Sequence, residues 1–359
     1  MLLLAASCTT DLNVHSGEPE SVLVLNSTIR TCNAEHYADV SVSRLREGVE
    51  MLSDATLDVY INGEYRCSAH YYTPDTYPNF SPIDYGGVQK FMFKTGYYFN
   101  ADLHEGDEVR LEASWGGLRA SASVTVPEAL ELLAVDTVTV KTTPYFDNME
   151  GLECKLKYRD IPGQDNYLRL LASYHQEVVD HAWHDGVSVD TLSMYHTEEP
   201  FNFFFDDDEI LRGDFHSSRE QEAIRETDLN LPLVTNKFCI FTDEGFKDSD
   251  YTATTYIRKS FYEPPQEMFR SRTVTSNLTF ILLTLSKDDY LLHRAYTNAD
   301  TNGLLNSGDW ITQILFEPVT FPSNVEGGLG FVCVEAASSV RLDFPVREIP
   351  EYSAKNQSK

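Results

Sequence analysis

The chain has 359 residues, and its 28 Lys and Arg stand against 56 Asp and Glu, which gives a formal net charge of −28. Because so acidic a chain repels phosphate backbones and anionic lipid heads, the composition disfavours nucleic-acid binding. The length predicts two domains with separate cores. No segment approaches the roughly 18 consecutive apolar residues of a membrane helix.

The first eight residues, MLLLAASC, resemble the end of a secretory signal with its lipobox. Small residues precede Cys8. The signal would be cleaved on the amino side of Cys8, and this cysteine would then be acylated. A basic region is missing, so we expect the natural start to lie upstream; a chance cysteine is the alternative. Residues 9–20 are polar, as suits a tether between a membrane and a domain. We therefore assign residues 1–20 to a signal remnant, lipobox and tether.

Residues 21–127 alternate between apolar and polar side chains with a period of two and show no helical period. The run Val22–Ser27 is largely apolar on both faces, which is typical of an inner strand. Residues 62–64 are expected to form a three-residue hairpin loop, because an odd number points the apolar sets on both sides inward. This pattern predicts an immunoglobulin-like or transthyretin-like β-sandwich.

A second hairpin in the same region turns at Gly116-Gly117. Apolar residues alternate toward the glycines and away from them. The turn therefore places Trp115 opposite Leu118 and directs both apolar sets to one face.

Residues 128–359 are predicted to form a larger antiparallel β domain with one short helix. The chain is expected to cross into it in an extended conformation, with a strand at 135–140. Further strands are expected at residues 153–160, 167–179, 237–242, 251–257 and 278–285. Ser286 is the expected N-cap of the helix, and Asp288 and Asp289 fill the first turn, where the helix dipole favours negative charge.

A glycine-rich turn lies near the C-terminus, between two further predicted strands. It is neither a Walker loop nor a dinucleotide fingerprint, since no Gly-Lys-Ser/Thr follows and the glycine spacing differs. Because glycine lets another chain approach closely, Glu326, Gly327, Gly328 and Gly330 are the candidate contact with a partner. A purely structural turn is the more common role of such a sequence.

Five cysteines follow Cys8, namely Cys32, Cys67, Cys154, Cys239 and Cys333. An odd number leaves at least one unpaired, and no C-x-x-C spacing supports a zinc ribbon or a redox pair. Disulfides joining Cys32 to Cys67 and Cys154 to Cys239 would each stay within one domain. Five buried thiols are an equal alternative.

Two clusters contain side chains that bind metals. His175, His181 and His184 converge only if the chain turns near residues 185–186, and a solvated hairpin tip is the favoured alternative. Residues 206–209 (DDDE) lack the register of an EF-hand, so a capped loop after a buried strand is favoured over calcium binding. We therefore expect no metal and no cofactor.

Catalytic motifs are absent from the sequence, which has no G-x-S-x-G, S-x-x-K or H-E-x-x-H. Carboxylates are numerous, but no pair is singled out for glycoside hydrolysis. We therefore expect a protein that is not an enzyme. The aromatic residues at 71–72, 77 and 97–99 either form a platform for a sugar or peptide or belong to the sheets, and the second interpretation is favoured.

Three segments resemble a family of Bacteroidota outer-membrane lipoproteins, number 4249 among the domains of unknown function. They are Y-R-D-I-P-G-Q-D-N-Y at 158–167, L-S-K-D-D-Y-L at 285–291 and P-S-N-V-E-G-G-L-G-F at 322–331. With the lipobox, the resemblance covers nearly the whole chain.

The resemblance implies a lipoprotein anchored in the outer membrane, at the cell surface. It further implies a non-catalytic accessory, for ligand capture or as a lid, of a TonB-dependent transporter in nutrient uptake, because members look to be encoded beside such barrels. A free-standing surface adhesin or glycan-binding lipoprotein is the alternative. Neither hypothesis identifies the ligand.

Overall fold

The computed structural model describes residues 21–44, 48–73, 95–141, 151–184, 187–198, 203–217, 220, 223, 233–258, 271–301 and 321–349. Strands dominate this part of the chain. Its main helices are α1 (Glu209–Arg212), the 3-10 helix η2 (Asp243–Gly245) and α3 (Lys287–Thr301). Among the helices described, none has the length and apolar character that crossing a membrane requires.

The N-terminal part is a sandwich of two sheets. The smaller sheet has the order β5-β4-β8-β9 and consists of β4 (Thr56–Ile61), β5 (Glu64–Ser68), β8 (Glu108–Trp115) and β9 (Leu118–Thr125). The opposite layer consists of β1 (Val22–Arg30), β2 (Glu35–Arg44), β3 (Gly48–Met51), β6 (His70–Tyr72) and β7 (Gly96–Asn100). The β1 strand lies between two neighbours, so the prediction of an inner strand at its start is confirmed.

The C-terminal part again has two layers. One is a sheet of order β10-β11-β16-β14, with β10 (Glu131–Val140), β11 (Gly151–Arg159), β14 (Phe203–Phe204) and β16 (Asp250–Arg258). The other contains β12 (Tyr167–His184), β13 (Val187–Glu198), β15 (Ile240–Thr242), β17 (Ser271–Leu285), β18 (Val332–Asp343) and β19 (Arg347–Ile349). The six strands predicted by residue range for this part are present, and five of them are longer than expected. The strand predicted before the glycine-rich turn lies largely outside the described residues.

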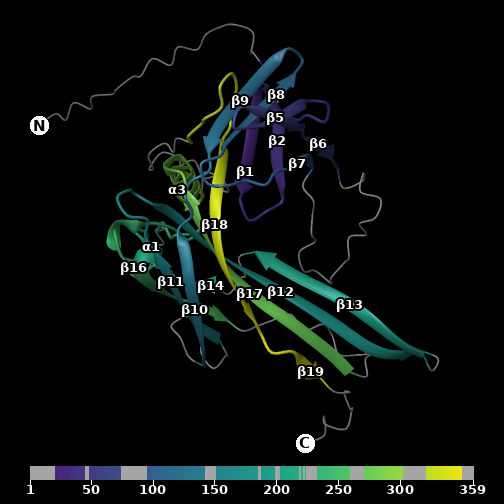
Figure 1. Ribbon diagram of the computed structural model, residues 1–359, viewed down its shortest axis with the longest axis vertical. Helices are drawn as coiled ribbons and strands as arrows, with labels where there is room; N and C mark the ends of the chain where they lie inside the picture. Colours follow the sequence, from purple (N-terminus) through teal and green to yellow (C-terminus); the bar gives the residue numbers. More distant parts are fainter. Residues whose placement is uncertain are drawn as a thin grey trace, which may run out of the picture.

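The β18 strand belongs to both parts, as Figure 1 shows where its yellow ribbon runs from the upper sandwich into the lower sheets. Its first residues, Val332 to Glu335, pair in parallel with β1. From Ala336 onward it pairs antiparallel with β17. One continuous sheet therefore runs through both parts, in the order β13-β12-β17-β18-β1-β2-β7-β6.

Two main hydrophobic cores follow from these layers. Residues from Leu23 to Val126 form the upper core, which β18 completes with Val332, Val334 and Ala336. The lower core joins β10, β11 and β16 to the face of β12 and β17. The division after residue 127 stays a prediction, because β18 contributes to both layered parts.

The predicted fold class is confirmed: the chain is mainly β, with a sandwich followed by a larger antiparallel region. The helix after Ser286 is also confirmed, since the Ser286 hydroxyl accepts a hydrogen bond from the Asp289 N–H at 3.2 Å. This helix spans Lys287–Thr301. The sequence analysis missed α1, which has only four residues.

The predicted three-residue hairpin loop is wrong. Asn62 and Gly63 alone form the turn, with φ of 54° and 79°, and β5 starts at the next residue. The ladder shifts after Val59, where the partner strand holds Arg66 as one extra residue. This bulge supplies the odd residue that turns the later side chains inward, and it leaves Tyr65 58% exposed.

The predicted hairpin at Gly116-Gly117 is confirmed, with Trp115 opposite Leu118. Both glycines have positive φ, 55° and 88°. Replacing both with Val should lower the free energy of unfolding by about 2 kcal/mol or more, because a β-branched residue resists this conformation. Urea unfolding measures the change. The matched control is Gly116→Asn, which should cost much less because asparagine tolerates this region; equal stability of the Val variant and the wild type would contradict the turn.

Candidate functional site

The α3 helix presents two neighbouring faces to the rest of the protein. Tyr290 and Arg294 are four residues apart and therefore share one face, and Asp289 and His293 share the next. Ser286 fixes the start of the helix through its capping hydrogen bond. The first of these faces borders a pocket.

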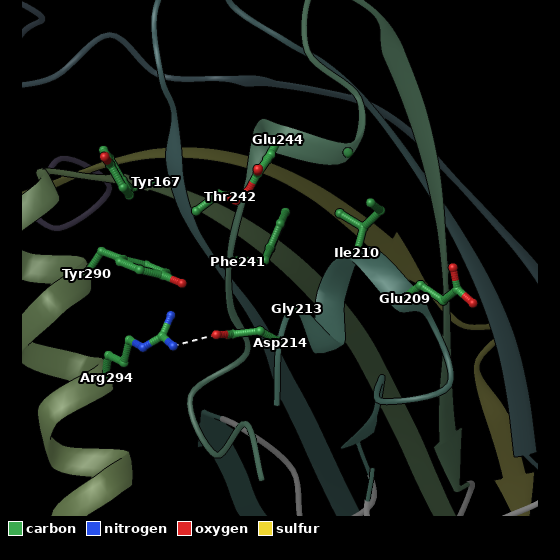
Figure 2. A pocket seen from close by; sticks show the side chains of 11 residues that line it. Tyr167, Glu209, Ile210, Gly213, Asp214, Phe241, Thr242, Glu244, Tyr290 and Arg294 are labelled. Atoms are coloured by element: carbon green, nitrogen blue, oxygen red, sulfur yellow. Dashed lines mark hydrogen bonds and ion pairs between the residues drawn. The ribbon is translucent and has the colours of Figure 1, made fainter. Parts of the chain in front are cut away.

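The pocket lies between α3, α1 and the end of β15, with a volume of about 570 Å³. Figure 2 shows Tyr290 and Arg294 projecting from α3, with Asp214 facing the guanidinium. The full lining is Tyr167, Glu209, Ile210, Gly213, Asp214, Phe241, Thr242, Glu244, Gly245, Tyr290 and Arg294. Segments far apart in sequence thus supply the walls.

Charge in the pocket is predominantly negative. Arg294 forms an ion pair with Asp214, and its guanidinium lies 5.5 Å from the centre of the Phe215 ring. Glu209 and Glu244 add two carboxylates to the lining. Burial raises the pKa of Tyr290, an effect that nearby Arg294 partly opposes, so this phenol stays neutral at physiological pH.

One wall of the pocket is aromatic. The rings of Tyr167 and Tyr290 lie 5.3 Å apart at 44° and form an aromatic wall. Aromatic faces together with carboxylates recognise polar or positively charged organic groups. The sequence analysis did not single out these residues; the spacing of Tyr290 and Arg294 on a predicted helix was the available signal.

The glycine-rich turn lies against the protein's own sandwich. Glu326 exchanges two backbone hydrogen bonds with Ser121 of β9, at 2.7 and 2.9 Å. Leu329 is hydrogen-bonded in the same way to β1, through Leu23 and Leu25 at 2.8 and 2.9 Å. The turn therefore connects the two layers of the sandwich at their edge.

Close approach explains three of these glycines. A Cβ atom would lie 2.7 Å from the Arg119 carbonyl oxygen at Gly327, 2.6 Å from the Leu23 oxygen at Gly328, and 2.2 Å from the Leu25 oxygen at Gly330. The structural role is thus confirmed. Glu326 and Gly327 are exposed, and their contact with a partner stays a prediction.

The histidine cluster does not form a single site. The β12 strand is continuous through His184, so its predicted turn comes only after that residue. His175 and His181 are six residues apart on this strand, a distance of about 20 Å. His181 contacts Asp190 at 2.9 Å and Thr273 at 3.1 Å. One ion cannot therefore bind both histidines.

The acidic run at 206–209 contains a helix cap. Asp208 accepts hydrogen bonds from the N–H groups of Ile210 and Leu211 at 3.1 Å. It also accepts from the Tyr251 hydroxyl at 3.0 Å and the Thr254 N–H at 2.9 Å. The favoured prediction of a capped loop is confirmed for this residue.

The predicted aromatic platform belongs largely to the core. Tyr97 and Phe99 are buried, and the Tyr97 hydroxyl donates to the Leu52 carbonyl at 3.0 Å. Tyr71 packs against Tyr97 with ring centres 5.3 Å apart. The favoured interpretation is confirmed for these residues, and Tyr77 lies outside the described part of the chain.

No disulfide joins the five cysteines in the described part of the chain. The alternative of five buried thiols is wrong as well, because Cys154, Cys239 and Cys333 are buried whereas Cys32 is exposed and Cys67 is partly exposed. Burial raises the pKa of Cys154 to about 12, and burial also raises that of Cys333. These two thiols stay protonated at neutral pH, as structural cysteines do. Cys8 and the tether lie outside the described residues.

Fold and site together describe a mainly β protein in which one strand is shared by both layered parts and an acidic, aromatic pocket lies beside α3. The chain belongs to the family described as Domain of unknown function (DUF4249), whose match covers residues 9–341. No curated protein matches it.

Gly330 provides a test of the packed turn. Its φ is +117°, and Gly330→Ala should lower the unfolding free energy by about 3 kcal/mol or more, because the new Cβ meets the β1 backbone. The matched control is Gly163→Ala, whose φ of +83° is also positive but whose Cβ would meet nothing within 4 Å. That variant should lose only about 1 kcal/mol in urea unfolding. Equal losses would mean that strain alone, without the close approach, explains Gly330.

Proposed function

We propose that this member of the family is a lipoprotein of the Bacteroidota outer membrane, anchored at the cell surface through Cys8. It acts as a non-catalytic accessory of a TonB-dependent transporter. The family match over residues 9–341 supports the proposal. The lipoprotein and the transporter partner come from the resemblance described above, whose members look to be encoded beside such barrels. The tether at 9–20 holds the folded part near whatever shares its membrane.

The pocket beside α3 supports ligand capture as the form of this accessory role. Its volume of about 570 Å³ falls within the range of small-molecule sites. Tyr167, Tyr290 and Phe241 offer aromatic surface, while Glu209 and Glu244 contribute charge. Such a lining would retain a polar nutrient near the barrel without chemical change.

Confinement to one membrane raises the effective concentration of a neighbouring barrel, so even a modest interface stays occupied. The exposed backbone of the glycine-rich turn at 326–330 remains our candidate for this interface. Its backbone is already hydrogen-bonded to β1 and β9, which leaves Glu326, Gly327 and the exposed side chain of Leu329 as the accessible portion.

The anchor is tested by Cys8→Ala in a chain with a complete signal upstream. Lipidation requires the thiol, so the variant should leave the membrane and appear in the soluble fraction. Fractionation followed by immunoblotting measures the distribution. Cys32→Ala is the matched control, since this exposed thiol is downstream of the lipobox and its loss should not release the protein. Membrane retention of the Cys8 variant would contradict the anchor.

The partner is tested by purifying the tagged protein from native membranes in mild detergent. A TonB-dependent barrel should be recovered with it in near-stoichiometric amount. Glu326→Arg should reduce this recovery if the turn forms the contact, whereas Glu64→Arg, at the exposed start of β5, should not. Recovery of the lipoprotein alone, under conditions that preserve other transporter complexes, would replace the accessory role with that of a free-standing adhesin.

A further inference from the structure

A buried cluster of charged and polar side chains lies on the second face of α3, where the two layered parts meet. Asp289 and His293 come from the helix, and Glu335 comes from β18 next to the residue where that strand changes partners. One ligand atom from each lies within 4.8 Å of the others. Asp289 and Glu335 are 0% exposed.

The carboxylate of Asp289 is the unusual feature of this cluster. Neither of its oxygens accepts a hydrogen bond of good geometry within the described part of the chain, although Nδ1 of His293 and the Cys333 thiol lie beside the carboxylate, and Oε1 of Glu335 lacks such a bond too. Burial of an unpaired carboxylate is costly, and native proteins rarely leave such oxygens without a donor or a cation. Oδ1 of Asp289 lies 3.1 Å from Nδ1 of His293, so the carboxylate faces the cluster.

The position of His293 is fixed from both sides. Its Nε2 lies 3.1 Å from Nη1 of Arg169, and its Nδ1 lies 3.0 Å from the Asp289 carbonyl oxygen. Because a guanidinium only donates, Nε2 must accept and Nδ1 must carry the proton. This tautomer, with Nδ1–H on a backbone carbonyl, is the one that leaves Nε2 free to bind a metal.

Arg169 occupies the place of a cation in this arrangement. Its Nη1 lies between Nε2 of His293, at 3.1 Å, and Oε1 of Glu335, at 3.8 Å. The same guanidinium has a second anchor, because its Nε donates to the Phe238 carbonyl at 3.2 Å. Arg30 holds the other carboxylate oxygen of Glu335 at 2.6 Å.

We propose that Asp289, His293 and Glu335 form a binding site for a divalent transition metal ion, Zn²⁺, that displaces Nη1 of Arg169. One imidazole nitrogen and two carboxylates are a donor set that Zn²⁺ accepts and that imidazole makes unfavourable for Ca²⁺. Arg30 stays on Oε2 of Glu335 and orients Oε1. The ion would link α3 directly to β18.

Zn²⁺ titration of the purified, untagged full chain after chelator treatment tests the site by calorimetry. We expect one equivalent of Zn²⁺ to bind, and Co²⁺ to give visible absorption bands from nitrogen and oxygen ligands. His293→Ala should weaken binding by about 100-fold or more, beyond the loss expected from a supporting residue. The matched control is His181→Ala, a half-buried histidine of β12 outside the cluster, which should bind as the wild type does.

Arg169→Gln gives a result that a purely structural role would not produce. Removal of the guanidinium opens the cation position, so Zn²⁺ should bind at least about 10-fold more tightly than to the wild type. Asp289→Asn keeps the shape of the side chain and should also weaken Zn²⁺ binding. This variant replaces His293→Ala as the test if circular dichroism shows that His293→Ala does not fold. Absence of Zn²⁺ binding, binding unchanged in both ligand variants, or binding of Ca²⁺ alone would overturn the proposal and leave an ion-pair network.

Discussion

The joining of the two layered parts depends on the buried charge of Glu335. A carboxylate that is 0% exposed is tolerated only with partners, and here the partners come from both sides: Arg30 from β1 of the sandwich and Arg169 from β12 of the lower sheet. Removing one guanidinium would leave charge uncompensated in the interior, a loss that typically costs about 3–5 kcal/mol. The side chain of Glu335 thus contacts both β1 and β12, two strands that lie on opposite sides of the β17–β18 pair.

Backbone pairing reinforces this junction. Where β18 passes from β1 to β17, the Thr31 N–H donates to the Glu335 carbonyl at 3.1 Å, and the Ala337 N–H donates to the Thr31 hydroxyl at 2.9 Å. The polar backbone groups at the change of partner are therefore satisfied. Because β1 and β18 lie roughly 300 residues apart in sequence, their pairing has a high entropic cost of loop closure. The sandwich is therefore complete only after β18 has paired with β1.

Local pattern was sufficient for the elements but not for their assembly. Period-two alternation predicted the strands. The start of α3 was predicted from Ser286 and the acidic residues after it. Both signals act within a few residues of the chain. The hairpin at Asn62-Gly63 was misjudged because a bulge at Arg66 satisfies the same inward alternation as a longer loop. The pairing of β18 with β1 has no local signal, since strand partners are chosen by packing between distant residues.

The candidate site shows the same limit. Asp289 was explained by the helix dipole alone, yet the fold buries it beside Glu335, a residue of another element. Gly327, Gly328 and Gly330 were recognised as unusual, but only the tertiary structure distinguishes the approach of the protein's own strands from that of a partner. The sequence identifies which residues are constrained. Which neighbouring atoms constrain them depends on the tertiary structure.

The pocket and the charged cluster lie on two adjacent faces of the same helix, α3. Successive residues on a helix are rotated by about 100°, so Tyr290 and Arg294 in the pocket lie directly beside Asp289 and His293 in the cluster. A ligand that competes with Asp214 for Arg294 acts on the same helical turn that positions His293 against Arg169. Since Arg169 also holds Glu335, a shift of α3 would reach the strand that joins both parts. The α3 helix is therefore the element that the pocket and the charged cluster share.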